Sequence, residues 1–263
     1  MNDSHFPFAH ATDAGSLRAG PIDTLAGSAD ATALAADAPL TEDSDPMLLA
    51  PGASGELLRG APWQRYAVIG DSIAKGIGDP SPGYQPIGWA ERVATALRGA
   101  NPGLHYLNTG RMGATTAQVR DEQLSRALEF EPDLVHVICG GNDLFVADPD
   151  LDALRANLGA LFAPLAATGA QLCTFTVADV WETERMAAMA PMRDRMAALN
   201  AIISDVAARY DALLVDFWTH PLRLRPDLMS ADLIHFTSSG HAVVATEMIR
   251  ALSALIPPGP ATR

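Results

Sequence analysis

The sequence predicts an α/β protein: a three-layer sandwich whose five-stranded parallel sheet is covered by helices on both faces. Five short apolar runs in the 263-residue chain alternate with longer segments of helical periodicity. Short, compact apolar runs are typical of strands that are buried on both faces of a sheet. Strands that alternate with helices form a parallel sheet, because the crossover helices pack on its two faces.

Each element has a recognisable place in the chain. The expected strands are residues 66–69, 104–107, 134–139, 172–177 and 213–217, and the expected helices are residues 89–97, 116–130, 151–167, 192–210 and 238–256. The last helix starts after Thr237 and Ser238, which favour helix N-termini, and it stops before Pro257. Residues 61–258 are therefore interpreted as one domain, followed by a short tail over residues 259–263.

The first 60 residues differ in composition from the rest of the chain. They hold nine acidic residues and two arginines, a charge of −7 out of the −13 of the whole chain, and no sustained apolar period. Too few large apolar groups are present to offset the entropy lost on ordering. We expect residues 1–60 to form an acidic, Ala/Asp/Pro-rich extension that is mobile or loosely docked, although its apolar pieces at 47–49 and 57–58 can attach to the domain.

Composition and charge exclude several classes of function. The net charge of −13 argues against a nucleic-acid partner, because phosphates require basic surfaces. No apolar run approaches the ~20 residues of a membrane-spanning helix, so no integral membrane segment is expected. The first ten residues lack the Lys or Arg of a secretory signal, which favours a cytoplasmic location. No cluster of His, Cys, Asp and Glu has metal-ligand spacing, so neither a metal nor another cofactor is expected.

Polar segments, most of them glycine-rich, follow the predicted strands at the edge where parallel sheets bind their ligands. These segments are Gly70-Asp71-Ser72, Asn108-Thr109-Gly110, Gly140-Gly141-Asn142-Asp143 and the stretch from Asp232 to His235. Because the carboxyl ends of parallel strands share one edge of the sheet, we expect all four segments to meet there.

Ser72 and His235 have the side chains of a serine nucleophile and its base. A serine hydroxyl is a poor nucleophile until a base takes its proton. Asp232 lies three residues before His235, so in a turn its carboxylate can hold the imidazole Nδ1–H and direct the other ring nitrogen toward Ser72. Ser72 can instead be the N-cap of a helix. His241 is the alternative base, although its place inside the last helix favours a structural role.

Two further residues can stabilise the negative charge of an acyl-transfer intermediate. Gly110 can offer its backbone N–H at close range, and the side-chain amide of Asn142 can donate a hydrogen bond without adding charge. The alternatives are a simple turn glycine at position 110 and a turn Asn that caps the next element at position 142.

These four segments, in this order, resemble those of the SGNH hydrolases, also called GDSL-type lipases and esterases. The resemblance covers about residues 64–256 and places Ser72, Gly110, Asn142 and His235 at the four residues after which that family is named. It implies a flavodoxin-like sheet of strand order 2-1-3-4-5, no metal, and an oxyanion hole formed by the Ser72 and Gly110 N–H groups and the Asn142 side chain. Phe236 stands where the family often has proline, which should alter only the local loop.

The function expected from these residues is hydrolysis of a carboxylic ester, or a related acyl bond, of a small molecule through an acyl-enzyme. The alternatives are acyl transfer to an alcohol or amine by the same triad, and a binding module that has lost catalysis. The segment after the fourth strand contains an aromatic residue and four methionines, namely Trp181, Met186, Met189, Met192 and Met196. Methionines adapt to varied apolar partners, so this segment can line an acyl pocket or pack the core.

Overall fold

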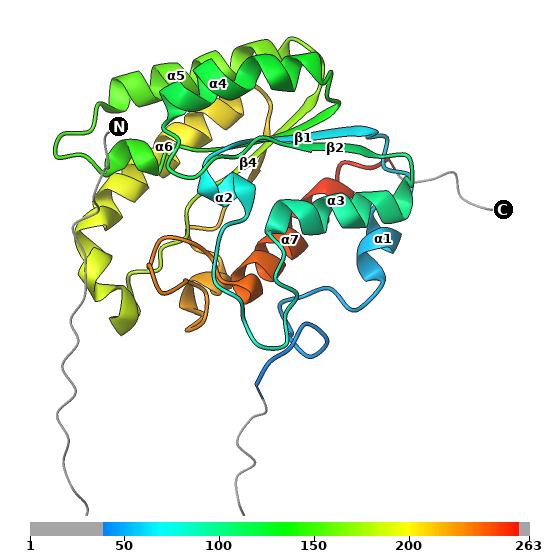
Figure 1. Cartoon of the computed structure of the whole chain (residues 1–263), viewed down its shortest axis with the longest axis horizontal. Helices are drawn as coiled ribbons and strands as arrows, with labels where there is room; N and C mark the ends of the chain where they lie inside the picture. The colour runs from blue at the N-terminus through cyan, green and yellow to red at the C-terminus, as the bar shows by residue number, and fades with distance from the viewer. Residues whose placement is uncertain (1–38, 258–263) are drawn as a thin grey trace, which may run out of the picture. The chain divides into compact units, whose positions relative to one another are not determined.

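Five parallel strands form a single sheet of order β2-β1-β3-β4-β5 in the computed structural model, which describes residues 39–257 (Figure 1). The strands are β1 (Arg65–Gly70), β2 (His105–Asn108), β3 (Leu134–Ile138), β4 (Gln171–Phe175) and β5 (Leu213–Val215). The predicted strands and their order are confirmed to within two residues at each end. The start of the predicted extension, residues 1–38, and the predicted tail at 259–263 lie outside the described residues.

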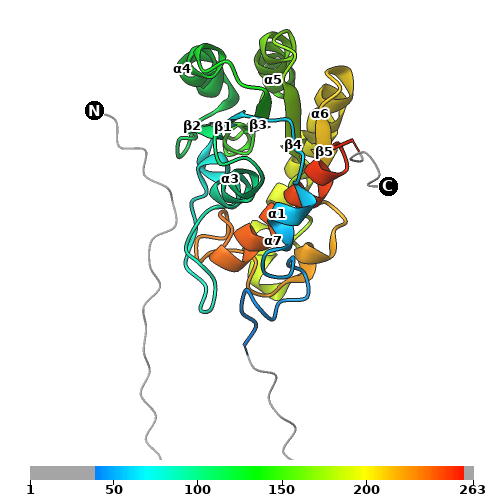
Figure 2. The same ribbon diagram turned by 90° about the vertical axis from the view of Figure 1, so that its right-hand side faces the viewer.

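Helices cover both faces of this sheet, which confirms the three-layer α/β architecture (Figure 2). One face is covered by α4 (Thr116–Glu129), α5 (Leu151–Ala166) and α6 (Arg193–Arg209). The other face is covered by α3 (Trp89–Ala100) and α7 (Ser238–Ser253), and α1 (Ala53–Leu57) packs against these two helices. The short helix α2 (Ser72–Lys75) follows β1 directly. None of the helices in residues 39–257 has the length and apolar content to cross a bilayer.

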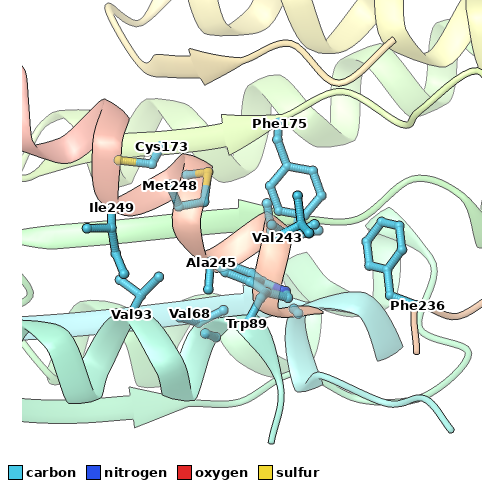
Figure 3. Close-up of a cluster of buried hydrophobic side chains, with 14 of the residues drawn as sticks. Val68, Trp89, Val93, Cys173, Phe175, Phe236, Val243, Ala245, Met248 and Ile249 are labelled. Atoms are coloured by element: carbon cyan, nitrogen blue, oxygen red, sulfur yellow. The ribbon is translucent and has the colours of Figure 1, made fainter. Parts of the chain in front are cut away.

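Two apolar layers, one on each face of the sheet, form the core. Beneath α3 and α7, Trp89 is fully buried and its ring lies 5.4 Å from that of Phe175 in an edge-on contact. Val243 and Met248 of α7 close this cluster (Figure 3). Burial of apolar surface on both faces contributes the main stabilisation of such a fold, and it explains why the strands lack polar alternation.

Strands β4 and β5 end two residues earlier than predicted because the side chain of Thr176 takes over their pairing. The Thr176 amide still donates to the Val215 carbonyl (3.1 Å). Its hydroxyl, however, accepts from the Phe217 amide (2.8 Å) and donates to Asp216 Oδ1 (2.6 Å). These side-chain bonds replace the next rung of the sheet, so both chains leave it at this point.

Residues 39–60 pack against the domain, so for this part of the predicted extension the alternative of attachment holds. Leu58 is fully buried in the core beneath α3 and α7. Asp45 has a fully buried side chain that lies 2.6 Å from Arg225 Nη1 and accepts from the Tyr84 hydroxyl (2.8 Å). Glu42 also binds the domain, through Arg92 (2.5 Å) and the Gln85 amide (2.7 Å). The apolar pattern could not show this attachment, because two carboxylates and a few scattered apolar residues hold the segment in place.

We expect Asp45→Ala to lower the free energy of unfolding by about 3 kcal/mol, because its loss leaves the buried guanidinium and hydroxyl short of an acceptor. Urea unfolding measures this change. Glu56→Ala is the matched control in the same segment, since its ion pair with Arg59 is exposed and such pairs contribute little. Equal unfolding free energies for the two variants would contradict a role for Asp45 in attaching the segment.

His136 in β3 is a fully buried histidine whose two ring nitrogens have no hydrogen-bond partner among the described residues. Its ring packs edge-on against Tyr66 and Trp89, with centroids 5.3 and 5.2 Å away. Burial lowers the pKa of His136 to about 3. Below pH 6.5, His136 is protonated in the unfolded chain but stays neutral in the folded one. Its contribution to the free energy of unfolding therefore falls as the pH falls.

We expect the wild type to lose about 2 kcal/mol of unfolding free energy between pH 7 and pH 5 through His136, and His136→Phe to lack this loss. Urea titrations of both proteins at the two pH values measure the difference. The pH dependence of the wild type alone does not isolate His136, because Asp71 also titrates between pH 7 and pH 5. Burial raises the pKa of Asp71 to about 7, so its carboxyl binds a proton in the folded state over this range. An identical pH dependence of the two proteins would show that His136 is not a buried neutral base.

Candidate active site

The four polar segments that were predicted to meet follow the strands at the carboxyl edge of the sheet. Ser72 begins α2 directly after β1, and Asn142 begins the 3-10 helix η1 (Asn142–Leu144) after β3. Gly110 lies in the loop after β2, and His235 lies in the turn that leads into α7. This arrangement brings Ser72 and His235, 163 positions apart in the sequence, within hydrogen-bond distance.

Ser72, His235 and Asp232 form a continuous chain of hydrogen bonds. His235 Nε2 lies 2.7 Å from Ser72 Oγ, and His235 Nδ1 lies 2.6 Å from Asp232 Oδ2. Ser72 and His235 are buried, whereas the Asp232 side chain is 48% exposed. In this geometry the imidazole can take the proton of the serine hydroxyl while the carboxylate holds the ring. The structure thus brings together the three residues that were predicted to form a triad.

Hydrogen bonds keep the Asp232 carboxylate ionised. Partial burial acts to raise its pKa, but bonds from the His235 ring and from the amides of Ile234 (2.9 Å) and His235 (3.1 Å) outweigh burial and lower the pKa of Asp232. A carboxylate that stays charged can stabilise the imidazolium formed when His235 accepts a proton.

The turn before α7 is held by the loop that follows Ser72. Leu233 in this turn has a φ of 62°, a conformation that costs energy for a residue with a side chain. The Ser230 amide donates to the His235 carbonyl (2.7 Å), and the Asp79 amide donates to Ser230 Oγ (2.8 Å). The Asp79 carboxylate also accepts from the Ala231 amide (2.8 Å). These bonds hold the strained turn, and with it the orientation of His235.

His241, the alternative base, is buried and has structural contacts. Its Nε2 lies 3.1 Å from the Ile77 carbonyl, and its ring packs edge-on against Phe236 at 5.7 Å. Burial lowers the pKa of His241 to about 4. Because it makes no hydrogen bond to Ser72, these contacts support the structural role that its sequence position favoured.

Asp71 occupies the N-cap position that was considered as an alternative role for Ser72. The Asp71 carboxylate accepts from the Ile73 amide (2.9 Å), which satisfies the first turn of α2. Within residues 39–257 the Ser72 amide has no hydrogen-bond partner. The amide of Ser72 is therefore available to an anion beside its own hydroxyl.

Gly110 occupies a different environment from the predicted one. Its amide donates to Asn108 Oδ1 at 2.9 Å and is therefore already bound. A Cβ at this position would lie 2.6 Å from Lys75 N, so the close approach of the loop to α2 requires glycine. Asn108 strengthens the same contact by donating to the Ala74 carbonyl (2.8 Å). These contacts correspond to the turn-glycine alternative for Gly110 and leave no free N–H for an oxyanion.

Gly113, which sequence reasoning did not single out, lies beside Asn142. It has a φ of 72° in a turn closed by the Ala114 amide, which donates to the Arg111 carbonyl (3.2 Å). Asn142 Nδ2 donates to the Ala114 carbonyl (3.0 Å), which leaves its second hydrogen free. The Gly113 amide has no partner in the described part of the chain. A second glycine, two residues before the Thr115 cap of α4, was the signal that could have identified it.

A comparison with known protein families identifies the family of this chain. A sequence model of the GDSL-like lipase/acylhydrolase family matches residues 68–243. The chain belongs to this family. The matched range runs from β1 into α7 and includes Ser72, Asn142, Asp232 and His235. A comparison with curated proteins found no match.

Solved structures share the fold of this GDSL-like enzyme. An alpha/beta hydrolase from the metagenome of Lake Arreo is 23% identical, with a TM-score of 0.59 over 76% of this chain and 98% of its own. A lipase/acylhydrolase from Enterococcus faecalis is 20% identical, with a TM-score of 0.58 over 75% and 100%. An acetylxylan esterase from Geobacillus stearothermophilus is 22% identical, with a TM-score of 0.59 over 72% and 94%. These similarities support the predicted flavodoxin-like SGNH fold.

An apolar pocket opens beside Ser72 in the GDSL-like enzyme. Its walls come from the carboxyl ends of β3 and β4, from the 3-10 helix η2 (Glu184–Met192), from α6 and from the turn before α7. Trp181, Met186, Met189 and Met196 line this pocket. Met192 instead packs into the apolar layer beneath α5 and α6. Met186 and Met196 also belong to the buried core, so this segment both lines the pocket and packs the core.

Proposed function

We propose that this enzyme hydrolyses carboxylic esters through an acyl-enzyme formed on Ser72. The observation that carries the proposal is the pair of hydrogen bonds at 2.7 and 2.6 Å that link Ser72 Oγ, the His235 ring and the Asp232 carboxylate. Membership of an acylhydrolase family supports the same chemistry, because a triad of this kind is typical of that family.

In the acylation step, Ser72 Oγ forms a bond to the ester carbonyl carbon while His235 Nε2 takes the hydroxyl proton. The carbonyl oxygen becomes an oxyanion in the tetrahedral intermediate. When the intermediate collapses, the bond to the alcohol oxygen breaks and His235 returns its proton to that oxygen. The acyl group stays on Ser72 as an ester, and the alcohol leaves.

In the deacylation step, water takes the position of the alcohol beside His235. His235 Nε2 accepts one proton of the water molecule while the water oxygen attacks the acyl carbon. Collapse of the second tetrahedral intermediate returns the proton to Ser72 Oγ and releases the carboxylic acid. Asp232 holds the Nδ1 side of the ring in both steps.

In this proposal the oxyanion lies against the Ser72 amide, the Gly113 amide and Asn142 Nδ2, so Gly113 replaces Gly110 among the predicted donors. The free amides of Ser72 and Gly113 and the second hydrogen of Asn142 support this choice, whereas the Gly110 amide is bound to Asn108. Donors that are positioned before the reaction stabilise the developing charge without reorganisation.

A fluorophosphonate tests the proposed function, because it reacts with an activated serine and mimics the tetrahedral intermediate. We expect one adduct per chain, located on Ser72 by mass spectrometry. In a crystal structure of the adduct, the phosphoryl oxygen should lie about 3 Å from the amide nitrogens of Ser72 and Gly113 and from Asn142 Nδ2. Failure to label, with no ester hydrolysed, would favour the alternative of an inactive binding module.

We expect Asn142→Ala to lower kcat by roughly 10²–10³-fold with little change in KM, because its donor is needed chiefly when the oxyanion forms. Rates are normalised to active sites counted with the phosphonate, and unfolding is measured on the same preparation. If Asn142 were only a turn cap, the substitution would lower the melting temperature and leave the normalised kcat near the wild-type value.

A further inference from the structure

The pocket beside Ser72 is lined by hydrocarbon over most of its surface. The side chains in its lining that hold nitrogen or oxygen belong to Asp71, Ser72, Asn142, Thr174 and Trp181. Thr174 Oγ1 donates to the Val137 carbonyl (2.9 Å), and Trp181 Nε1 donates to the Met189 carbonyl (2.7 Å). Beyond Asp71, the nucleophile and Asn142, the side chains of the lining therefore have no free donor for a hydroxyl or a charged group, and the pocket favours an alkyl chain.

The pocket suits the acyl half of an ester better than its alcohol half. Deacylation needs water beside His235, where the alcohol was, so that position has to be open to solvent. An apolar cavity gives water few hydrogen-bond partners. On the β2 side of Ser72, by contrast, residues 111–113 are exposed and leave a path for alcohol and water. The acyl group remains in place through both steps, so it can occupy the dry pocket.

The wall formed by η2 and α6 is tied to the rest of the site. Arg185 Nη2 donates to the Ser230 carbonyl (2.9 Å), which connects η2 to the turn that carries His235. Met186 and Met189 of η2 and Met196 of α6 face this space. Unbranched methionine side chains can adapt to an alkyl chain within a wall whose backbone is fixed.

The volume and closed end of the pocket limit the chain that fits. The cavity measures about 120 Å³, somewhat less than the roughly 150 Å³ of an engineered apolar cavity that binds the six carbons of benzene. Met196, Leu199 and Ile203 line it from one face of α6. As a crossover helix, α6 runs back from the carboxyl edge of the sheet, so Ile203 lies about 10 Å deeper than Met196.

We propose that the enzyme prefers acyl groups of about six carbons, with the carbonyl carbon at Ser72 and the rest of the chain in this pocket between Ser72 and Ile203. The preference rests on the proposed function, since the chain has to be attached to Ser72. An acetyl group would leave most of the pocket unfilled. Each methylene that enters it should raise kcat/KM about fourfold until the chain reaches the closed end.

Two ester series test the assignment of the pocket to the acyl half. For p-nitrophenyl esters with acyl groups from acetate to dodecanoate, kcat/KM should rise about a hundredfold or more from acetate to hexanoate and then fall. For acetates of linear alcohols of the same lengths, kcat/KM should change by less than about tenfold, because the alcohol side is open to solvent.

Variants of α6 test the position of the closed end. Ile203→Phe should shift the preferred acyl length down by two carbons or more. Ile202→Phe is the matched control, because Ile202 is buried on the same helix but does not line the pocket. Ile203→Ala should extend the preferred length, because it removes side-chain volume at the closed end, and this variant decides the question if Ile203→Phe does not fold.

Several results would overturn the proposal: fastest hydrolysis of the acetate, a length dependence in the alcohol series in place of the acyl series, or an unchanged acyl profile in Ile203→Ala and in folded Ile203→Phe. These results differ from a failure of the proposed function itself. In that case no ester of either series would be hydrolysed, and the fluorophosphonate would not label Ser72.

Discussion

Ser72→Ala is expected to lower kcat on a soluble ester by about 10⁶-fold, because it removes the covalent step and leaves only binding and the oxyanion donors. The substitution deletes one oxygen from a residue that buries little apolar surface, so the melting temperature should change little. Steady-state kinetics and thermal unfolding of the same preparation measure both quantities.

A serine far from the pocket provides the control for this experiment. Ser253 lies at the end of α7, where its hydroxyl donates to the Arg250 carbonyl (2.7 Å). Ser253→Ala should keep the wild-type kcat and the phosphonate adduct. Residual activity of Ser72→Ala above about 1% of wild type, together with an adduct on another residue, would identify a different nucleophile.

His235→Ala is expected to lower kcat by at least about 10⁴-fold, since no other group in residues 39–257 lies within hydrogen-bond distance of Ser72 Oγ to take its proton. His241→Ala should instead lower the melting temperature, because it leaves a gap behind Phe236 and frees the Ile77 carbonyl. Both variants are measured for kcat per active site and for unfolding. A greater loss of kcat in His241→Ala would make His241 the base and leave Asp232 without its proposed role.

The double variant shows whether Ser72 and His235 act as a unit. If the only task of His235 is to activate Ser72, removal of both should cost about as much as Ser72→Ala alone. If the fold-loss of kcat in the double variant equals the product of the two single losses, His235 also acts independently of Ser72, for example on a water molecule that attacks the ester directly.

The arrangement of the sheet could be read from local patterns because its strands are buried on both faces. Residues 66–69 and 134–139 are compact apolar runs, and they correspond to the neighbouring central strands β1 and β3. The ends of β4 and β5 could not be placed in the same way. They depend on the hydroxyl of Thr176, which pairs with residues about 40 positions away in the sequence.

The choice between Gly110 and Gly113 as proposed oxyanion donors could not be made from the sequence either. Gly110 and Gly113 both follow β2, and both are glycines in a loop. Which of their amides is free depends on Asn108, whose side chain binds the first, and on α2, which the loop approaches closely. Neither contact has a local signature, so the sequence pattern alone favoured the glycine nearer to the strand.

The sequence by itself determined the fold class, the family and the order of the segments that meet at the carboxyl edge, because apolar periodicity and short motifs are local properties of a chain. Only the tertiary structure decided that residues 39–60 attach to the domain, which N–H groups stay unpaired, and how deep the apolar pocket is. Each of these depends on contacts between distant segments, such as that of Asp45 with Arg225 across 180 positions. Such contacts depend on how the segments pack in three dimensions, so the apolar pattern of neither segment predicts them.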